Sequence, residues 1–366
     1  MSKQHLLSPY TTKSLELSNR VVMAPMTRSR ANKEGNIPSK ELHGLYYEQR
    51  ASAGLIITEG APVSKRAVGY IHTPGIYSED QIKGWSQVSQ RVHNKGGKIF
   101  MQLWHVGRIS HPDFHNGELP LAPSAINPNT QSFTPKGFQD TVTPREMTTD
   151  EIKSTINDFK QAAANAIKAG FDGVEIHSSN GYLFHQFFSP CSNIRTDDYG
   201  GNIVNRTRFF FEVIEAMKTV IPEEKIGVRF NPSLHGLFGI TLDKETIPTF
   251  EYLMTELNKY NLAYVHLSEP FTDVSKVPFA VSNIAKHFRP IYRGTLIINS
   301  AFDQEKGNTI IEEGHADLVA YGKLFISNPD LVERFEYDLD LAAWDQDTFY
   351  TTGAKGYTDY EKAETP

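Results

Sequence analysis

The stretch TDEIKSTINDFKQAAANAIKAGFDGVEIHSSN, residues 149–180, contains a helical pattern followed by a strand pattern. Thr149 and Asp150 are candidate capping residues at the helix start, and Gly170 suits a left-handed turn after its end. Residues 172–177, which contain the β-branched Val174 and Ile176, are predicted to form a strand. A helix over residues 151–169 is predicted by apolar side chains that return every three or four residues, at Ile152, Ile156, Phe159, Ala163, Ala166 and Ile167.

The same alternation of strand and helix repeats along the whole chain. Strands that alternate with helices form a parallel sheet, and eight such units can close into a (βα)8 barrel. The length of 366 residues suits two domains or one large barrel. We predict a single α/β domain over residues 1–366, a (βα)8 TIM barrel. Its strands are expected at residues 20–25, 55–59, 99–104, 172–177, 226–230, 263–267, 295–298 and 317–320.

Two segments do not fit this repeat. Residues 6–18 alternate and turn, which predicts an N-terminal β-hairpin that plugs the bottom of the barrel. Residues 105–147 form a long, proline-rich excursion after the third strand. Connections of this length usually have a functional role, and we expect this one to lie over the mouth of the barrel.

The composition narrows the classes of function. The net charge is −6, and Cys191 is the single cysteine, which excludes an intrachain disulfide framework and a cysteine-ligated iron–sulfur cluster. No apolar signal segment or membrane span is found, and no basic block suggests nucleic acid. We therefore expect a cytoplasmic protein with small-molecule partners. The motifs of Rossmann dehydrogenases, P-loop NTPases and α/β-hydrolases are absent from the sequence.

Active sites of (βα)8 barrels lie at the carboxyl ends of the strands. Here those ends carry neutral hydrogen-bonding groups and few paired carboxylates, which suits a polar planar ligand better than a metal ion. The spacing His111 to His115 occurs in metal sites, but no third ligand follows it, so we predict no metal.

The motif His177-x-x-Asn180-x-Tyr182 follows the fourth strand. His177 and Asn180 could donate hydrogen bonds to one carbonyl or nitro oxygen and stabilise the negative charge that develops there. Tyr182, whose reference pKa is about 10, could supply a proton to carbon. A buried core histidine and a packing tyrosine are an equally good interpretation of these residues alone.

Three further strand ends offer groups for a ligand. Gln102 and Arg229 could face the polar edge of an electron-rich heterocycle, although a buried internal salt bridge would explain Arg229 equally well. Lys323 follows the eighth strand, where barrels of this kind often bind phosphate, but an exposed lysine is the commoner case.

Six strings in this order resemble the old yellow enzyme family of FMN-dependent ene-reductases, and the resemblance covers roughly residues 6–360. They are RVVMAPMTR (20–28), QLWH (102–105), HSSNGYLFHQF (177–187), SPCSNIRTDDYGG (189–201), ISNPDLV (326–332) and FYTTGAKGYTDY (349–360). The resemblance includes N-ethylmaleimide reductase-like, pentaerythritol tetranitrate reductase-like and 12-oxophytodienoate reductase-like members.

The resemblance implies FMN as cofactor and NADPH or NADH as hydride donor. Residues that match flavin-contacting positions of the family are Pro25, Met26, Thr27, Gly60, Gln102, Arg229 and Phe349. At the phosphate end, Gly322 and Lys323 stand where the family usually has Gly-Arg, and Ser300, followed by Ala301, replaces a glycine. Lysine keeps the positive charge of arginine but lacks its bidentate fork.

The same resemblance implies roles for the pocket residues. His177 and Asn180 match the pair that binds the substrate oxygen, and Tyr182 matches the proton donor. Trp104, Tyr70 and Tyr350 match aromatic positions that shape the substrate pocket.

From these matches we predict an NAD(P)H-dependent ene-reductase that transfers hydride from FMN N5 to an activated alkene, with Tyr182 protonating the neighbouring carbon. Nitrate esters, nitroaromatics and quinones are alternative acceptors. A flavin-binding barrel with little reductase activity and a metal-free phosphosugar isomerase or aldolase are the alternative classes. Either a monomer or a homodimer is expected.

Overall fold

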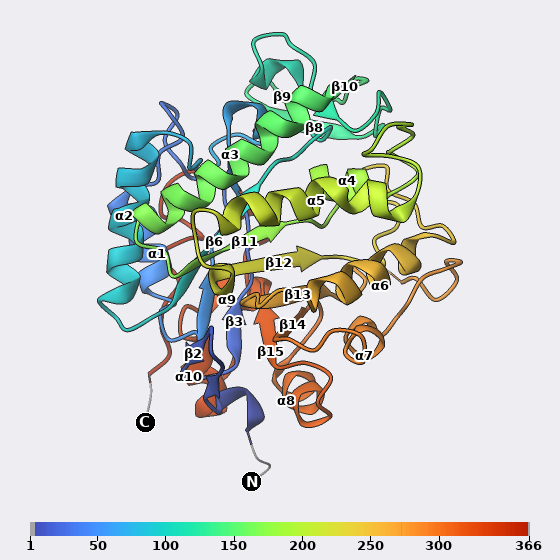
Figure 1. The fold of residues 1–366 in the computed structure, drawn as a ribbon. Coiled ribbons are helices and arrows are strands. Elements are labelled where there is room, and N and C mark those ends of the chain that lie inside the picture. The colour runs from blue at the N-terminus through green and yellow to red at the C-terminus, as the bar shows by residue number, and fades with distance from the viewer. Residues whose placement is uncertain (1–3, 272, 365–366) are drawn as a thin grey trace.

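The computed structural model describes residues 4–271 and 273–364, and its central feature is a closed parallel barrel (Figure 1). Each barrel strand pairs in parallel with the next barrel strand along the chain; the last, β15 (Leu318–Tyr321), pairs with the first, β3 (Val21–Met23), and β6 (Ile99–Trp104) pairs with β11 (Gly173–His177). Closure leaves no free sheet edge, and the predicted (βα)8 class is confirmed. The barrel strands are β3 (Val21–Met23), β4 (Leu55–Ile57), β6 (Ile99–Trp104), β11 (Gly173–His177), β12 (Ile226–Phe230), β13 (Tyr264–Ser268), β14 (Leu296–Asn299) and β15 (Leu318–Tyr321).

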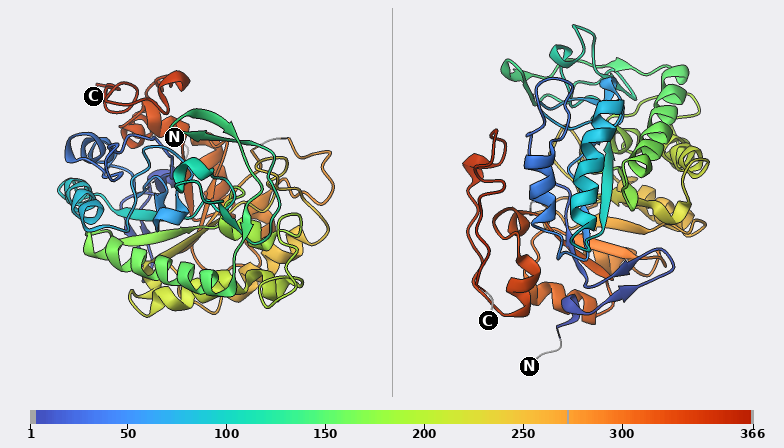
Figure 2. Two further views of the ribbon diagram at one scale, coloured as in Figure 1. Left: turned by 90° about the horizontal axis from the view of Figure 1, so that it is seen from above. Right: turned by 90° about the vertical axis from the view of Figure 1, so that its left-hand side faces the viewer.

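Helices surround the barrel on its outside, as the view from above shows (Figure 2, left). They are α1 (Leu45–Glu48), α2 (Glu79–His93), α3 (Thr149–Lys168), α4 (Leu183–Phe188), α5 (Ile203–Lys218), α6 (Thr246–Leu257), α7 (Ile284–Phe288), α8 (Gln304–Glu312), α9 (Lys323–Ser327) and α10 (Leu331–Glu336). Single turns lie at η1 (His5–Leu7), η2 (Lys40–Gly44), η3 (Lys65–Ala67), η4 (Pro112–Phe114), η5 (Glu223–Lys225) and η6 (Gln346–Thr348). None of the helices in the described ranges is both long and apolar enough to cross a lipid bilayer.

Helix α3 begins close to where the sequence predicts, but its cap is one residue earlier. The side chain of Thr148 accepts a hydrogen bond from the Glu151 amide, and Glu151 accepts one from the Thr148 amide. This reciprocal capping box satisfies two amides that the helix leaves free, so the prediction of Thr149 or Asp150 as the cap is wrong. Gly170 has a φ of +86°, as predicted for the turn after the helix.

The N-terminal hairpin and the long excursion lie at opposite ends of the barrel (Figure 2, right). The hairpin consists of β1 (Tyr10–Thr11) and β2 (Glu16–Leu17), which pair antiparallel. Leu15 and Leu17 pack in one cluster with Phe100 and Tyr264 of the barrel interior, so the hairpin closes the bottom as expected.

The excursion carries short strands at the mouth of the barrel. β8 (Gln131–Thr134) and β9 (Gly137–Asp140) form an antiparallel hairpin, and β7 (Leu121–Ala122) pairs in parallel with β10 (Arg145–Glu146). A further short strand, β5 (Ala61–Pro62), pairs with the end of β6. The β8–β9 hairpin thereby extends the wall of the barrel above the carboxyl ends of the strands.

Candidate active site

A cavity of about 630 Å³ opens at the carboxyl ends of the barrel strands. Its floor and one wall come from the ends of β3, β6, β11 and β12, and its upper wall comes from the β8–β9 hairpin and the C-terminal segment. The predicted site residues that line it are Pro25, Thr27, Tyr70, Gln102, Trp104, His177, Asn180, Tyr182, Arg229 and Tyr350.

Polar side chains beneath this cavity form a buried network. Glu175 accepts a hydrogen bond from Gln102 Nε2 at 2.8 Å and lies 2.8 Å from Nδ1 of His266. Burial lowers the pKa of Arg229, while the nearby Glu175 carboxylate raises it. Glu175 thus supplies a counter-charge within the barrel. The sequence could have indicated Glu175 as a site residue, because it lies two residues before His177 on one strand and so points to the same face as His177.

His177 is held as a neutral ring. Its pKa lies well below the ordinary value, first because of burial and then because of the positive charge of Arg229 nearby. Nδ1 lies 3.1 Å from the hydroxyl of the buried Ser179. The opposite nitrogen, Nε2, is therefore the one left for a ligand in the cavity.

Asn180 is oriented by a residue from the neighbouring strand. It has a φ of +57°, which asparagine tolerates better than most residues, and this conformation brings it next to Asn231 at the end of β12. Asn231 Nδ2 donates to Asn180 Oδ1 at 3.1 Å. The Asn180 oxygen is occupied in this way, and its NH2 group, which has no hydrogen-bond partner among the described residues, is available to the cavity.

Tyr182 lies in an aromatic cluster. Its hydroxyl is 2.9 Å from that of Tyr70, and its ring meets Trp104 edge-on at 4.9 Å between centroids. Burial raises the pKa of Tyr70 to about 12 and holds the pKa of Tyr182 well above its usual range, so both phenols are protonated at neutral pH. Trp104 also stacks on Tyr70 at 5.2 Å and on His177 at 5.9 Å.

Apolar side chains that the sequence prediction missed complete the upper wall. Phe133 and Phe138 face each other across the β8–β9 hairpin with centroids 4.8 Å apart, and Phe238 lies 5.7 Å from Tyr182. Phe138 is 68% exposed although it lines the cavity. The sequence predicts that the long excursion lies over the mouth of the barrel, but its irregular pattern does not indicate which side chains face inward.

Seven predicted flavin contacts do not line this cavity. Gly60 lies beside Trp104, since a Cβ there would stand 2.6 Å from the indole ring. Arg28 donates from Nε to the backbone oxygen of Phe349, and its guanidinium lies 5.8 Å from the Phe349 ring. The others are Met26, Ser300, Ala301, Gly322 and Lys323.

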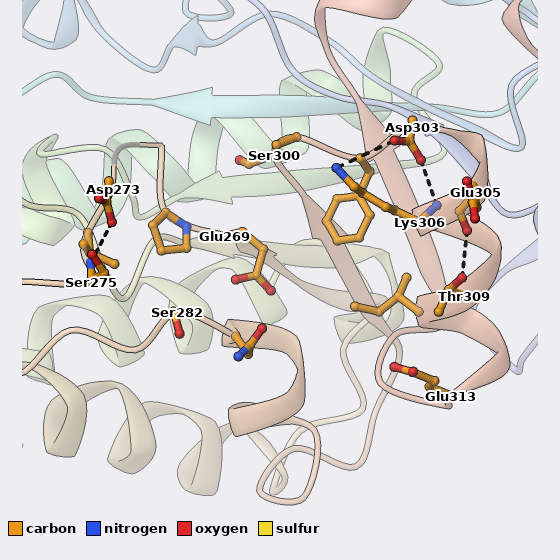
Figure 3. A pocket seen from close by; sticks show the side chains of 16 residues that line it. Glu269, Asp273, Ser275, Ser282, Ser300, Asp303, Glu305, Lys306, Thr309 and Glu313 are labelled. Atoms are coloured by element: carbon orange, nitrogen blue, oxygen red, sulfur yellow. Dashed lines mark hydrogen bonds and ion pairs between the residues drawn. The ribbon is translucent and has the colours of Figure 1, made fainter.

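The phosphate-end residues occupy two places. A Cβ on Gly322 would lie 3.5 Å from Met26 Sδ, so the end of β15 adjoins the end of β3. Lys323 is exposed, with Nζ 5.6 Å from the centre of the Trp344 ring. Ser300 and Ala301, with φ of +84° and +59°, line a separate groove between the β13–α7 loop and α8 (Figure 3).

That groove does not suit a phosphate group. It has a volume of about 680 Å³ and carries carboxylates on both sides, and its lysine, Lys306, lies 3.7 Å from Asp303 (Figure 3). A phosphate next to Ser300 and Ala301 would therefore have to lie on their other side, toward Gly322. The carboxylates are Glu269, Asp273, Asp303, Glu305 and Glu313.

The groups facing the main cavity fit a flavin. Arg229 is buried, yet its Nε has no partner in the described chain and its contact with Ser268 is long, at 3.5 Å. An unsatisfied buried guanidinium is costly, and the acceptor atoms of an isoalloxazine pyrimidine edge would satisfy it. Gln102 has its amide nitrogen bound to Glu175, which leaves its oxygen as an acceptor for a ring N–H.

Comparison with known proteins agrees with this site. Residues 5–342 match the model of the NADH:flavin oxidoreductase / NADH oxidase family. The chain is 43% identical over 361 residues to 12-oxophytodienoate reductase 1 of Oryza sativa subsp. japonica, covering 97% of this chain and 92% of the relative. It is 38% identical to 12-oxophytodienoate reductase 2 of Arabidopsis thaliana, covering 98% and 96%.

Solved structures agree in fold and sequence. Morphinone reductase superposes with a TM-score of 0.93 at 41% identity, covering 99% of this chain and 97% of that one. The old yellow enzyme homologue from Zymomonas mobilis gives a TM-score of 0.93 at 35% identity, covering 98% and 99%. The chain therefore belongs to the NADH:flavin oxidoreductase / NADH oxidase family, as an old yellow enzyme relative, and is an FMN-dependent oxidoreductase that uses NAD(P)H.

Proposed function

We propose that this oxidoreductase reduces the C=C bond of α,β-unsaturated carbonyl or nitro compounds. When bound, FMN would supply the redox chemistry, which is the relay of hydride from NAD(P)H to the acceptor. The chain's own residues bind the acceptor, polarise it and deliver a proton. Relatives named as reductases of 12-oxophytodienoate and of morphinone support an acceptor that carries a ketone.

His177 and Asn180 bind the oxygen of the acceptor. Each directs a neutral N–H donor at the point where negative charge develops as hydride reaches the β-carbon, and such fixed donors stabilise that charge strongly in a site with little water. The low pKa of His177 matters here, because a neutral ring donates a hydrogen bond without transferring its proton.

Tyr182 delivers the proton to the α-carbon. Its raised pKa keeps the hydroxyl protonated across the working range, and the Tyr70 hydroxyl at 2.9 Å can bond with the phenol oxygen as the proton leaves. The aromatic walls of Tyr70, Trp104 and Tyr350 bind the apolar part of the acceptor.

The remaining matched residues hold the cofactor in this proposal. Pro25, Met26, Thr27, Gly60 and Phe349 would hold its ring system, and Gln102 and Arg229 would bind the polar edge of that ring system. Ser300, Ala301, Gly322 and Lys323 bind the phosphate. The single domain, the cytoplasmic location, the choice between NADPH and NADH and the choice between monomer and homodimer stay predictions.

The observation that carries the proposal is that His177, Asn180, Tyr182 and Arg229 face one cavity, where the Nδ1 atom of His177 lies 3.1 Å from the Ser179 hydroxyl and the Oδ1 atom of Asn180 accepts from Asn231. An anaerobic spectrum of the FMN-loaded protein tests it. We expect NADPH to bleach the flavin absorbance and cyclohexenone to restore it. Bleaching without recovery would leave a flavin reductase that does not act on alkenes, and no bleaching by NADPH or NADH would contradict the proposal.

A further inference from the structure

Each of the two candidate oxygen-binding donors has its second heteroatom occupied by a buried neighbour. His177 and Asn180 both carry one atom that can donate and one that can accept. A ligand oxygen needs the donor in each case, and a ring or amide turned the other way would present a lone pair to that oxygen. The orientation of both side chains therefore decides whether the site attracts or repels a partial negative charge.

For Asn180, the occupied atom is the amide oxygen. Asn231 follows directly after β12 and is fully buried, and its Nδ2 donates to Asn180 Oδ1 at 3.1 Å. Within residues 4–271 and 273–364, the side chain of Asn231 has Asn180 as its one hydrogen-bond partner. The buried side-chain amide of Asn231 is therefore placed to orient Asn180.

For His177, the occupied atom is Nδ1. The Ser179 hydroxyl is fully buried, and its one polar partner in the described part of the chain is this nitrogen, at 3.1 Å. A buried hydroxyl proton requires an acceptor, so Ser179 donates to Nδ1. The proton of the neutral ring then resides on Nε2, the nitrogen that faces the cavity.

We propose that Asn231 and Ser179 are positioning residues: Asn231 turns the Asn180 amide so that its NH2 faces the acceptor oxygen, and Ser179 fixes His177 as the tautomer protonated on Nε2. This inference rests on the proposed function, since it assumes that His177 and Asn180 bind the acceptor oxygen. Neither positioning residue touches the acceptor. They determine whether each side chain presents an N–H group or a lone pair to the acceptor oxygen.

Phenol is the probe for the test, because in the proposed function its oxygen would take the place of the acceptor oxygen on the same donors, and its complex with oxidised flavin would absorb at long wavelength. Titration of the FMN-loaded protein gives the dissociation constant directly. We expect Asn231→Leu, which keeps the volume but cannot donate, to weaken phenol binding about tenfold, the loss of one charge-assisted hydrogen bond. The matched control is Asn165→Leu, which removes a buried amide of α3 that bonds to the Ile76 backbone oxygen, and it should leave the phenol affinity unchanged.

Asn231→Asp adds a readout that a merely structural residue would not give. Above the pKa of the new carboxyl, the carboxylate accepts from Asn180 and turns the amide away, so phenol binding falls by tenfold or more. Below that pKa, the protonated carboxyl can donate again and the affinity recovers toward that of the unsubstituted protein. The pH profile of the ratio between the two proteins therefore contains a titration that Asn231→Leu lacks.

A double-mutant cycle separates this inference from the proposed function. If Asn231 acts through Asn180, the substitution Asn231→Leu costs nothing further in a protein that already carries Asn180→Ala. If Asn180→Ala and His177→Ala both leave phenol binding unchanged, the proposed donors are wrong. If Asn180→Ala weakens phenol binding but Asn231→Leu does not, or if the two losses multiply, the positioning role of Asn231 is wrong.

The role of Ser179 is tested by nitrogen NMR of the holoprotein with 15N-labelled histidine. We expect the His177 Nδ1 signal of an unprotonated acceptor nitrogen and the Nε2 signal of a protonated one. Ser179→Ala should mix the two tautomers and weaken phenol binding a few-fold. A proton on Nδ1 in the unsubstituted protein would overturn the role assigned to Ser179.

Discussion

At the scale of single residues, we expect Tyr182 to act in one of the two half-reactions, the reduction of the acceptor, and not in the reduction of FMN. Its hydroxyl is needed only when a carbon atom takes up a proton, and FMN reduction by NADPH has no such step. We expect Tyr182→Phe to leave flavin reduction within about twofold and to slow reoxidation by cyclohexenone by about 10² or more, the usual contribution of a general acid. Stopped-flow absorbance of each half-reaction measures both rates.

A tyrosine away from the site provides the control for this substitution. Tyr252 lies on α6, outside the cavity, and Tyr252→Phe should leave both rates unchanged. Equal slowing of both half-reactions by Tyr182→Phe would instead mean that the ring supports Trp104, 4.9 Å away, and thereby the shape of the cavity.

At the scale of elements, the barrel was predictable because of how parallel strands are buried. β6 and β12 are buried along their whole length, and each is a mainly apolar run that one polar side chain interrupts, Gln102 in β6 and Arg229 in β12. The predicted bounds of both strands agree with the structure. The strands of the excursion are only two to four residues long, and all but the buried β7 are partly exposed, so none is long enough to give a clear strand pattern in the sequence. The hydrogen bond between Asn231 and Asn180 could not be predicted from the sequence either, because it joins two residues at the ends of different strands, 51 positions apart in sequence.

The loops after β14 and β15 contain the residues that we propose bind the FMN phosphate, and this proposal leads to a prediction about cofactor affinity. If Lys323 binds the FMN phosphate, Lys323→Gln should weaken FMN binding about tenfold, and Lys323→Arg should match or improve it through a bidentate contact. Quenching of flavin fluorescence on titration of the apoprotein measures the dissociation constant. The effect of Lys323→Gln should shrink at high salt, because charge screening weakens an exposed cation.

Lys306 is the matched control for Lys323. It lies in the carboxylate-lined groove beside Ser300 and is exposed like Lys323 (Figure 3). Lys306→Gln should leave FMN affinity unchanged if the phosphate lies on the Gly322 side of the loop. A larger loss from Lys306→Gln than from Lys323→Gln would move the phosphate into the groove and contradict the assignment.

At the scale of the whole molecule, buried arginines join the C-terminal segment to the barrel. Arg28 donates to the backbone oxygens of Phe349 and Gly356, and Arg30 donates to those of Thr348 and Lys355. These bonds bring residues 348–356 to the cavity, where Tyr350 and Thr351 become part of its wall. The two ends of the sequence thus build one side of the site together.

The carboxyl group of Glu59, next to Arg28, makes the attachment of the C-terminal segment to the barrel sensitive to pH. Glu59 is fully buried and accepts from the Arg28 amide at 3.2 Å, and burial raises its pKa to about 7 despite the nearby arginines. A carboxyl that holds its proton more tightly in the folded state stabilises the fold below its unfolded pKa of about 4.5. This contribution is lost as pH rises through about 7, up to ~3 kcal/mol.

We therefore expect the melting temperature of the FMN-saturated protein to fall between pH 5 and pH 8 by more than in Glu59→Gln, whose side chain stays neutral throughout. The exposed Glu336→Gln should keep the full fall of the unsubstituted protein. Parallel curves for Glu59→Gln and the unsubstituted protein would mean that Glu59 is ionised in the fold across this range. In that case the charge of Arg28 and Arg30, rather than burial, would decide the protonation of Glu59 where the C-terminal segment meets the barrel.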